Sequence, residues 1–270
     1  MHEVLRTLSE IGIVPVVALK DAADAVPLAR ALCSGGIPTA EVTFRTDAAA
    51  ASIAAMRQEV PEMLVGAGTV LTVENAEAAV AAGAAYIVTP GISEPVVRWC
   101  IGHGVPVLPG VSTASEVQKM LEYGIEIMKF FPAAASGGIA MLKGLYGPFQ
   151  KVRFVPTGGV NASNLNDFLR LPNVIACGGT WMVKNDLIHP EPLAEITRLS
   201  REAVRAMLGF SLDHVGITCG TAAASDRLPR TLRALFAFAS LTANSYVPHL
   251  PPLASTKPPP TAPPSPTHTP

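Results

Sequence analysis

The most constraining feature of the sequence is a regular alternation between short apolar runs and longer, Ala-rich amphipathic stretches. Each run is rich in Val, Ile or Phe and is closed by Gly, Pro, Thr or a charge, which is typical of a strand buried on both faces. Several of the intervening stretches end in Gly, as helices often do. The eight runs are IGIVPVVAL (11–19), TAEVTF (39–44), LVGAGT (64–69), YIVTP (86–90), VPVLPG (105–110), IEIMKFF (125–131), VRFVPTGG (152–159) and VIACGGT (174–180).

Eight strand–helix units before about residue 208 predict an α/β fold of the (β/α)8, or TIM barrel, type near its lower size limit. A doubly wound open sheet is the alternative, although it more often has about five to seven strands. Helices are expected over 22–36, 74–83 and 114–124, and Thr113 with Glu116 matches a capping box. In a barrel, reactive groups gather where the strands end, so those positions are the first to consider.

The C-terminal region does not continue this alternation. Ten of the chain's 25 prolines fall in residues 248–270, and a Pro-rich segment with few charges cannot bury a core. We therefore expect a barrel domain over 1–208, an extension of undetermined structure over 209–244, and a disordered tail over 245–270.

Composition excludes several classes of partner. A formal net charge of -1 and 6% aromatic residues leave no basic or stacking surface for nucleic acid or an anionic membrane. The apolar runs are too short to span a bilayer, and the N-terminal segment lacks the features of a signal peptide, so we expect a cytoplasmic protein. The four cysteines form no CxxC pair and no cluster with His, which predicts reduced thiols and no metal site.

The most informative single residue is Lys129, in the run IMKFFP. Because side chains alternate along a strand, Met128 and Phe130 are expected to face the helices and Lys129 the barrel interior. A lysine withdrawn from water loses its proton more readily, and a neutral amine can attack a carbonyl. The alternative is a lysine that ends a strand and reaches solvent. Lys20 is the rival amine, although the neighbouring Asp21 favours its charged form.

Glu41 and Arg45 have the same strand parity in the segment EVTFR and are separated by about 13 Å along an extended strand. Glu41 is expected deeper in the barrel, where it could act as a general acid or base. Arg45 is expected at the mouth, where it could bind a carboxylate with two parallel hydrogen bonds. The alternative is a structural ion pair, with Lys129 as one possible partner.

Glycine pairs close the seventh and eighth runs, at Gly158-Gly159 and Gly178-Gly179, and the second pair is followed by Thr180. Barrels often bind phosphate with the loops after these two strands, because glycine lets backbone N–H groups approach an anion. Two tight turns that need positive φ are the alternative, and we favour the phosphate interpretation. The segment GAGTV (66–70) is a weaker signal and is compatible with a turn.

These features together resemble the 2-keto-3-deoxy-6-phosphogluconate (KDPG) aldolase family, which is also active on 4-hydroxy-2-oxoglutarate (KHG). The order and spacing of the motifs match over roughly residues 5–206. The matching segments are EVTFRT (41–46), VGAGTV (65–70), TPGISEP (89–95), PGVSTASE (109–116), KFFPA (129–133), PTGGV (156–160) and GGTWMV (178–183).

The resemblance implies a class I aldolase, usually a homotrimer, that cleaves a small phosphorylated 2-keto acid without metal or other cofactor. It makes Lys129 the Schiff-base lysine, which forms an imine with the C2 ketone, and Glu41 the group that shuttles protons. Arg45 and Thr69 would hold the substrate carboxylate. The remaining implied contacts are Phe131, packing on the substrate, and Gly158, Gly159, Gly179 and Thr180, binding the phosphate.

Three other functions stay open at this point. A non-catalytic phosphosugar-binding barrel would bind ligand but would not be trapped by borohydride. A 2-dehydro-3-deoxy-6-phosphogalactonate aldolase is a close alternative, but those enzymes usually lack an Arg at the position of Arg45. An isomerase or epimerase would need a second acid or base at a strand end. Residues 209–218 faintly resemble the start of a glyoxalase-like extension, and we assign His214 no metal role.

Overall fold

All the strand pairs in the described part of the chain, residues 2–188 and 193–209 of a computed structural model, are parallel. The expected disordered tail and nearly all of the expected extension lie outside the described residues. Each of the eight predicted runs contains a strand, and a second strand begins at the last residue of the fifth run. The strands are β1 (Ile13–Val17), β2 (Thr39–Thr43), β3 (Leu64–Gly68), β4 (Ile87–Val88), β5 (Val107–Leu108), β6 (Gly110–Val111), β7 (Ile127–Phe130), β8 (Arg153–Pro156) and β9 (Cys177–Gly179).

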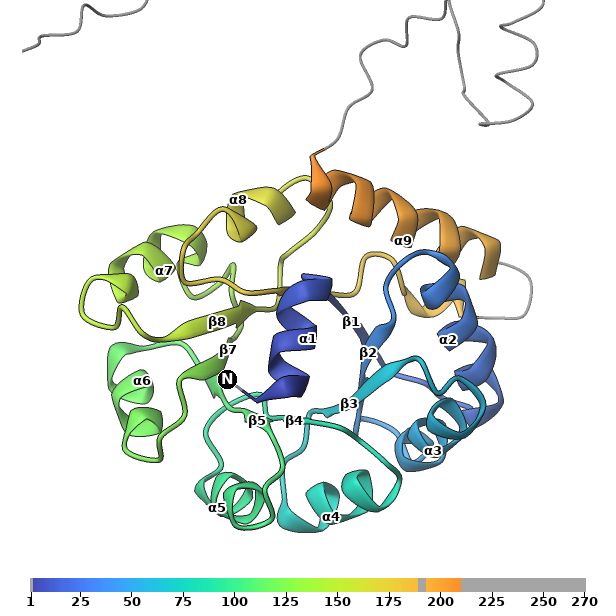
Figure 1. The fold of residues 1–270 in the computed structure, drawn as a ribbon, viewed down its shortest axis with the longest axis horizontal. Helices are drawn as coiled ribbons and strands as arrows, with labels where there is room; N and C mark the ends of the chain where they lie inside the picture. Colours follow the sequence, from blue (N-terminus) through green and yellow to red (C-terminus); the bar gives the residue numbers. More distant parts are fainter. Residues whose placement is uncertain (1, 189–192, 210–270) are drawn as a thin grey trace, which may run out of the picture. The chain divides into compact units, whose positions relative to one another are not determined.

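The strands form two sheets that curl around a common centre (Figure 1). A six-stranded sheet has the order β5-β4-β3-β2-β1-β9, and a three-stranded sheet has the order β6-β7-β8. Pro109 separates β5 from β6 and lacks the N–H that a continuous ladder would use. Isolated parallel bridges link Phe154 to Val174 and Thr157 to Gly178. The pairing establishes an α/β fold with a curled parallel sheet.

The helices surround this sheet on its outer side, except for α1, which lies across the centre in Figure 1. All three predicted helical stretches contain a helix, and the capping box at Thr113 and Glu116 is present. The helices are α1 (Glu3–Ile11), α2 (Ala25–Ser34), α3 (Ala49–Glu59), α4 (Val73–Ala81), α5 (Glu94–Gly102), α6 (Ala114–Leu121), α7 (Gly138–Tyr146), α8 (Leu165–Leu169) and α9 (Leu193–Leu208), with short 3-10 turns η1 (Ala22–Asp24) and η2 (Asn185–Leu187).

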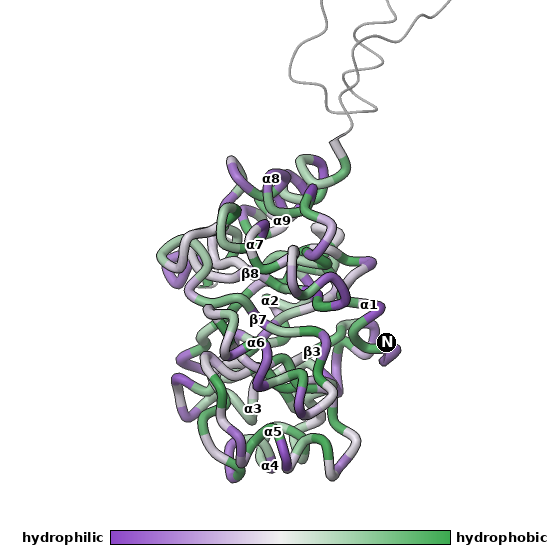
Figure 2. The backbone as a smooth tube through the Cα atoms, turned by 90° about the vertical axis from the view of Figure 1, so that its left-hand side faces the viewer, coloured by the Kyte–Doolittle hydropathy of each residue, from purple (hydrophilic) through white to green (hydrophobic). Residues whose placement is uncertain are grey.

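Two buried apolar clusters follow from strand alternation. The outer cluster fills the space between sheet and helices and includes Val42, Val65 and Met128. Figure 2 shows hydrophobic residues along the central strands and hydrophilic residues in peripheral turns and helices. The inner cluster fills the curl of the sheet and receives Leu5 and Leu8 from α1. Because α1 leads directly into β1, it closes the end of the sheet at which the strands begin.

The predicted alternation in β7 is confirmed. Met128 and Phe130 belong to the outer cluster, and Ile127 belongs to the inner one. Lys129 therefore faces the interior of the curl, where it is 5% exposed. The alternative of a lysine that reaches solvent is wrong.

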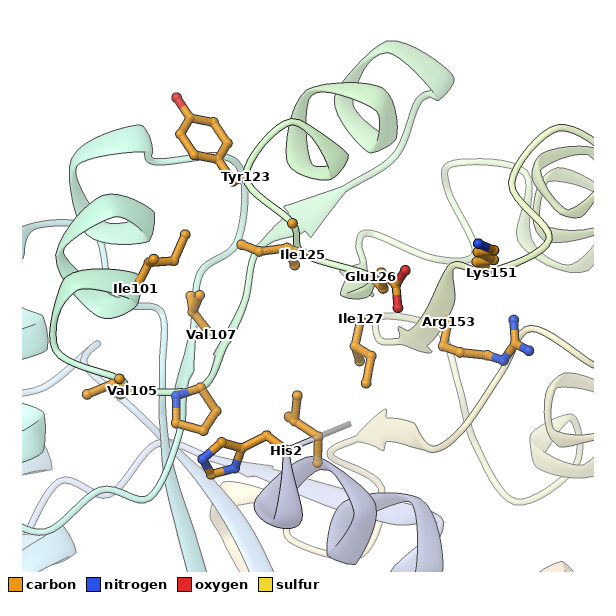
Figure 3. A pocket seen from close by; sticks show the side chains of 14 residues that line it. His2, Ile101, Val105, Val107, Tyr123, Ile125, Glu126, Ile127, Lys151 and Arg153 are labelled. Carbon is orange, nitrogen blue, oxygen red and sulfur yellow. The ribbon is translucent and has the colours of Figure 1, made fainter.

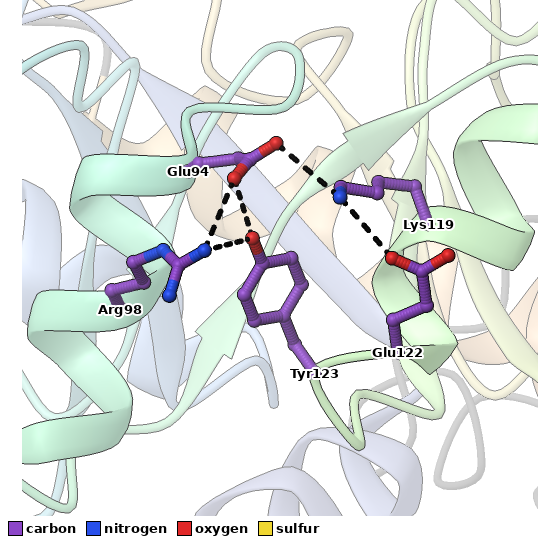
Figure 4. Close-up of polar contacts among 5 residues, drawn as sticks. All are labelled: Glu94, Arg98, Lys119, Glu122 and Tyr123. Atoms are coloured by element: carbon purple, nitrogen blue, oxygen red, sulfur yellow. Dashed lines mark hydrogen bonds and ion pairs between the residues drawn. The ribbon is translucent and has the colours of Figure 1, made fainter.

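A polar network at the surface ties α5 to α6 (Figure 4). The Tyr123 hydroxyl donates to the Glu94 carboxylate, Arg98 Nη2 donates to the same hydroxyl at 2.9 Å, and Lys119 lies 3.6 Å from Glu94. The hydrogen bond from Tyr123 is the largest influence that lowers the pKa of Glu94. Because the charged groups are exposed, we expect this network to contribute little stability.

Candidate active site

Lys129 and Glu41 form an ion pair inside the curled sheet. Lys129 comes from β7 and Glu41 from β2, 88 residues apart in the chain. Nζ of Lys129 donates a hydrogen bond to Oε1 of Glu41 at 3.0 Å. Both residues are almost fully withdrawn from water, with 5% and 3% exposure. The pairing of Glu41 with Lys129, one possibility from the sequence, is therefore present.

A buried ion pair is weak evidence for stability, since removing both charges from water is costly. Its arrangement instead suits chemistry, because an amine nucleophile has a carboxylate within hydrogen-bond reach to exchange protons with. The Nζ atom also lies 5.2 Å from the centre of the Phe131 ring, within the range of a cation–π contact. Lys20, the rival amine, is exposed beyond the end of β1 and lines a different hollow.

Above this pair lies a cavity of about 190 Å³, which we call the mouth cavity. It opens at the end where the strands finish, as expected for a parallel α/β sheet. Seven of the nine predicted site residues line it, and Glu41 lies beneath them in contact with Lys129. The lining residues are Val16, Arg45, Lys129, Phe131, Thr157, Gly158, Gly159, Val160, Gly179 and Thr180.

The glycine pair after β8 has a backbone conformation that is compatible with both interpretations from the sequence, a tight turn and a phosphate-binding loop. Gly158 and Gly159 adopt φ of 95° and 84°, which disfavours any residue with a Cβ atom. They also line the mouth cavity together with Gly179 and Thr180 from the end of β9. A tight turn and an exposed backbone therefore coexist at this place, where N–H groups can approach an anion.

Arg45 lines the mouth cavity, but the expectation that it continues the strand from Glu41 is wrong. β2 ends at Thr43, and Arg45 is an exposed residue in the turn that follows. The chain turns because Thr46 donates its hydroxyl to the carbonyl of Leu19, after Phe44 N has made the last contact with Gly68 O at 2.8 Å. Arg45 is consequently placed by the turn and not by strand parity.

Thr69 follows β3 directly and has φ of 54°. A β-branched residue in the left-handed region is strained, and such strain is found disproportionately at functional sites. Thr69 is not among the residues that line the mouth cavity. Its predicted role with the substrate carboxylate stays a prediction.

Val16, Thr157 and Val160 line the mouth cavity without having been singled out from the sequence. Strand alternation could have found Thr157, since Val155 of β8 lies in the inner cluster and Thr157 has the same parity. Val16 follows the same rule in β1, where Val14 lies in the inner cluster. Val160 lies in a loop and had no such signal.

A larger hollow, of about 630 Å³, lies at the opposite end of the sheet (Figure 3). It is lined by residues at the starts of strands, such as Val107, Ile127 and Arg153, and by His2 and Leu5 near α1. Because the strands are parallel, this hollow is separated from Lys129 and the mouth cavity. It therefore does not belong to the candidate active site.

The described part of the chain has free thiols but no cluster of metal ligands. That part of the chain contains no group of three or more His, Cys, Asp or Glu side chains placed to hold a metal ion. Cys33, Cys100 and Cys177 are free thiols, and burial raises the pKa of Cys100 to about 11. Residues 2–188 and 193–209 contain no helix long and apolar enough to cross a membrane.

Comparisons with known proteins identify what the chain is similar to. The family model described as "KDPG and KHG aldolase" matches residues 4–199. The 2-dehydro-3-deoxy-phosphogluconate aldolase of Treponema pallidum is 49% identical over 205 residues, covering 76% of this chain and 98% of that protein.

Two solved structures are also similar. A KDPG aldolase from Legionella pneumophila, with pyruvate captured as a covalent carbinolamine intermediate, has a TM-score of 0.72 and 39% identity, covering 75% of this chain and 98% of that one. The 2-keto-3-deoxy-6-phosphogluconate aldolase of Zymomonas mobilis ZM4 with 3-phosphoglycerate has a TM-score of 0.71 and 36% identity, covering 75% and 95% of the two chains.

Proposed function

Because the chain belongs to the KDPG and KHG aldolase family, we propose that it cleaves 2-dehydro-3-deoxy-6-phosphogluconate to pyruvate and glyceraldehyde 3-phosphate. It is an aldolase, a carbon–carbon lyase, and 4-hydroxy-2-oxoglutarate is a second substrate, cleaved to pyruvate and glyoxylate. The observation that carries the mechanism is the buried contact of 3.0 Å between Lys129 and Glu41 beneath the mouth cavity.

Lys129 is the nucleophile of this mechanism. Its neutral amine adds to the C2 carbonyl of the substrate to give a carbinolamine, which loses water to become an iminium ion. The Legionella relative was captured with pyruvate at the carbinolamine stage, which supports this step. Because Lys129 lines the mouth cavity, the C2 carbonyl of a 2-keto acid bound there can reach Nζ.

Glu41 is the proton acceptor and donor. It takes the proton of the C4 hydroxyl, partly through a water molecule, as the C3–C4 bond breaks. The electron pair of that bond moves into the iminium to give an enamine, and glyceraldehyde 3-phosphate leaves. Protonation of the enamine carbon and hydrolysis of the imine then release pyruvate and restore Lys129. The contact with Nζ supports this role, because a substrate bound to the amine would have the carboxylate within hydrogen-bond reach.

The two charged ends of the substrate are assigned to different groups of residues. We assign the carboxylate to Arg45 and Thr69, and packing against the substrate to Phe131. Gly158 and Gly159 with Gly179 and Thr180 bind the phosphate, and the positive φ of the first pair supports this because it exposes backbone N–H groups. The hydroxyl of Thr180 is exposed at the cavity and is available as a further donor.

The alternative functions are not favoured. The relatives named as KDPG aldolases are 49% and 39% identical to this chain, whereas a solved "Native KDPGal structure" is 26% identical, which favours the gluconate reaction. These relatives are named as enzymes, which disfavours a phosphosugar-binding protein without turnover. An isomerase would need a second acid or base beside the cavity, and Glu41 is the one carboxylate in contact with Lys129 among the described residues.

The finer features of the fold and the assembly are part of the same proposal. A closed (β/α)8 barrel over residues 1–208 is supported by the two bridges that link β8 to the region of β9, and by β5 and β6 being separated by one residue. A homotrimer and a cytoplasmic location follow from the family resemblance. Light scattering coupled to size-exclusion chromatography tests the trimer.

Borohydride trapping tests the function. The protein is incubated with pyruvate and sodium borohydride, and the labelled peptide is identified by mass spectrometry. We expect the label on Lys129 and its loss in Lys129→Ala, while the control Lys20→Ala keeps the label and the activity. If Lys129→Ala is still labelled, another amine performs the chemistry and the assignment is wrong.

A further inference from the structure

Two glycines of β3, Gly66 and Gly68, face the interior of the curled sheet. Leu64 packs against the inner cluster, whereas Val65 and Ala67 belong to the outer cluster, so alternation turns both glycines inward. Neither glycine adopts a φ in the left-handed region, where alanine would be strained. The backbone conformation therefore does not require glycine at either position. If glycine is required, the reason is that the sheet interior has no room for a side chain there.

Two side chains of the site region occupy that space. A Cβ atom on Gly66 would lie 2.5 Å from Cε1 of Tyr86, within its aromatic ring. A Cβ atom on Gly68 would lie 2.5 Å from Cγ and 2.7 Å from Cδ of Glu41, and closer still to Oε1. Real Cβ contacts are essentially never shorter than 3.0 Å, so Glu41 could not keep its position beside an alanine.

The register between β2 and β3 explains why Glu41 needs this space. Glu41 is opposite Gly66, and Thr43 is opposite Gly68. The ring of Tyr86 fills the space over Gly66, with its hydroxyl 3.5 Å from the Thr39 hydroxyl. The carboxylate of Glu41 therefore leans along the strand toward Gly68, and there it meets Lys129 Nζ.

We propose that Gly68 is a positioning residue for the aldolase reaction: because Gly68 has no side chain, the Glu41 carboxylate can occupy the space beside it and is held there next to Lys129. This inference rests on the proposed function, since it concerns the proton transfers assigned to Glu41. Gly68 itself touches no reacting atom. Its role is to let a buried carboxylate stand within hydrogen-bond distance of the amine.

The first test is Gly68→Ala, with Gly144→Ala as the matched control. Gly144 lies in α7, and a methyl group there meets nothing within 4 Å. We expect kcat of Gly68→Ala to fall about 100-fold, because a displacement of about 1 Å in a catalytic group can have that effect. KM should change far less, since the groups assigned to substrate binding are not displaced. A kcat within twofold of the wild type would overturn the proposal.

A double-mutant cycle separates positioning from a general defect. Glu41→Asp shortens the side chain by one methylene and withdraws the carboxylate from Gly68. We expect the added methyl of Gly68→Ala to reduce kcat less than about tenfold in that background, compared with about 100-fold in the wild type. If the two effects are independent, the methyl does not act through Glu41 and the proposal is wrong.

Folding provides the remaining outcome. If Gly68→Ala alone is unfolded, Gly68→Ala in the Glu41→Ala background must be as stable as Glu41→Ala alone, because the side chain that met the methyl is gone. A double variant that still fails to fold would show that the methyl collides with another group. Wild-type protein that borohydride and pyruvate do not label would refute the proposed function instead, whatever Gly68→Ala does.

Discussion

The buried Lys129–Glu41 pair should reduce the stability of the fold relative to an apolar pair of the same size. The test uses two variants, Lys129→Met alone and Lys129→Met with Glu41→Leu. The single variant leaves the Glu41 carboxylate 3% exposed and without its partner at 3.0 Å. The double variant replaces both charges with apolar groups of similar volume. They would join the inner cluster, where Val88, Leu108 and Val155 already pack.

The expected changes in unfolding free energy are opposite in direction for the two variants. Removing one partner of a buried ion pair costs about 3–5 kcal/mol, and about 2–4 °C of Tm per kcal/mol for a domain of this size gives a fall of roughly 6–20 °C. Replacing both partners is often neutral or stabilising by about 1–4 kcal/mol. The double variant should therefore melt at or above the wild-type Tm. Neither variant should be labelled by borohydride.

The assay is urea and thermal unfolding followed by circular dichroism, at one protein concentration because an oligomer's Tm depends on it. A single variant as stable as the wild type would show that Glu41 is hydrated or neutral without Lys129. A double variant no more stable than the single one would show that packing, and not charge burial, dominates at this site. Either result would refute the reasoning that the pair is kept for chemistry.

Three further predictions concern neighbouring groups. Glu41→Gln should lower kcat about 10²–10⁴-fold with imine formation slowed but detectable by trapping, whereas Arg45→Ala should mainly raise KM. A small effect of Glu41→Gln on kcat would indicate that the ion pair of Glu41 with Lys129 is only structural. Thr69→Gly should stay within about 1 kcal/mol of the wild type in unfolding free energy, because relief of the strained φ of 54° offsets the greater freedom of glycine in the unfolded chain. The same variant should raise KM for pyruvate. Thr69→Ala should melt at a lower temperature than Thr69→Gly, and the reverse order would contradict the strain at this position. Tyr123→Phe removes the hydrogen bond that chiefly lowers the pKa of Glu94. A carboxylate with a lowered folded pKa stabilises the fold above its ordinary pKa of 4.5, so the variant's small loss in Tm should be present at neutral pH and vanish as acid protonates Glu94; a loss that persists in acid would point to packing.

Features that depend on local periodicity could be predicted from the sequence. The strand runs, the capping box at Thr113 and the inward direction of Lys129 each follow from residues within a few positions of one another. The place of Arg45 at the mouth could also be predicted, but the turn that carries it could not, because that turn is held by a hydrogen bond from Thr46 to Leu19, which belongs to another strand–helix unit. The split of the fifth run at Pro109 depends likewise on which sheet each half joins.

Glycines show most clearly where sequence reasoning loses information. Glycine can be required for two different reasons, a positive φ or the absence of a side chain, and the sequence alone does not distinguish them. At Gly158 and Gly159 the backbone does need positive φ, and the proposed anion site is compatible with that turn. At Gly68 the φ is ordinary and the need is space, which depends on Glu41, a residue 27 positions away on the neighbouring strand. The segment GAGTV was therefore a weak signal when taken alone. The reason for its second glycine follows from the register of β3 beside β2, in which the Glu41 carboxylate lies over Gly68 and contacts Lys129.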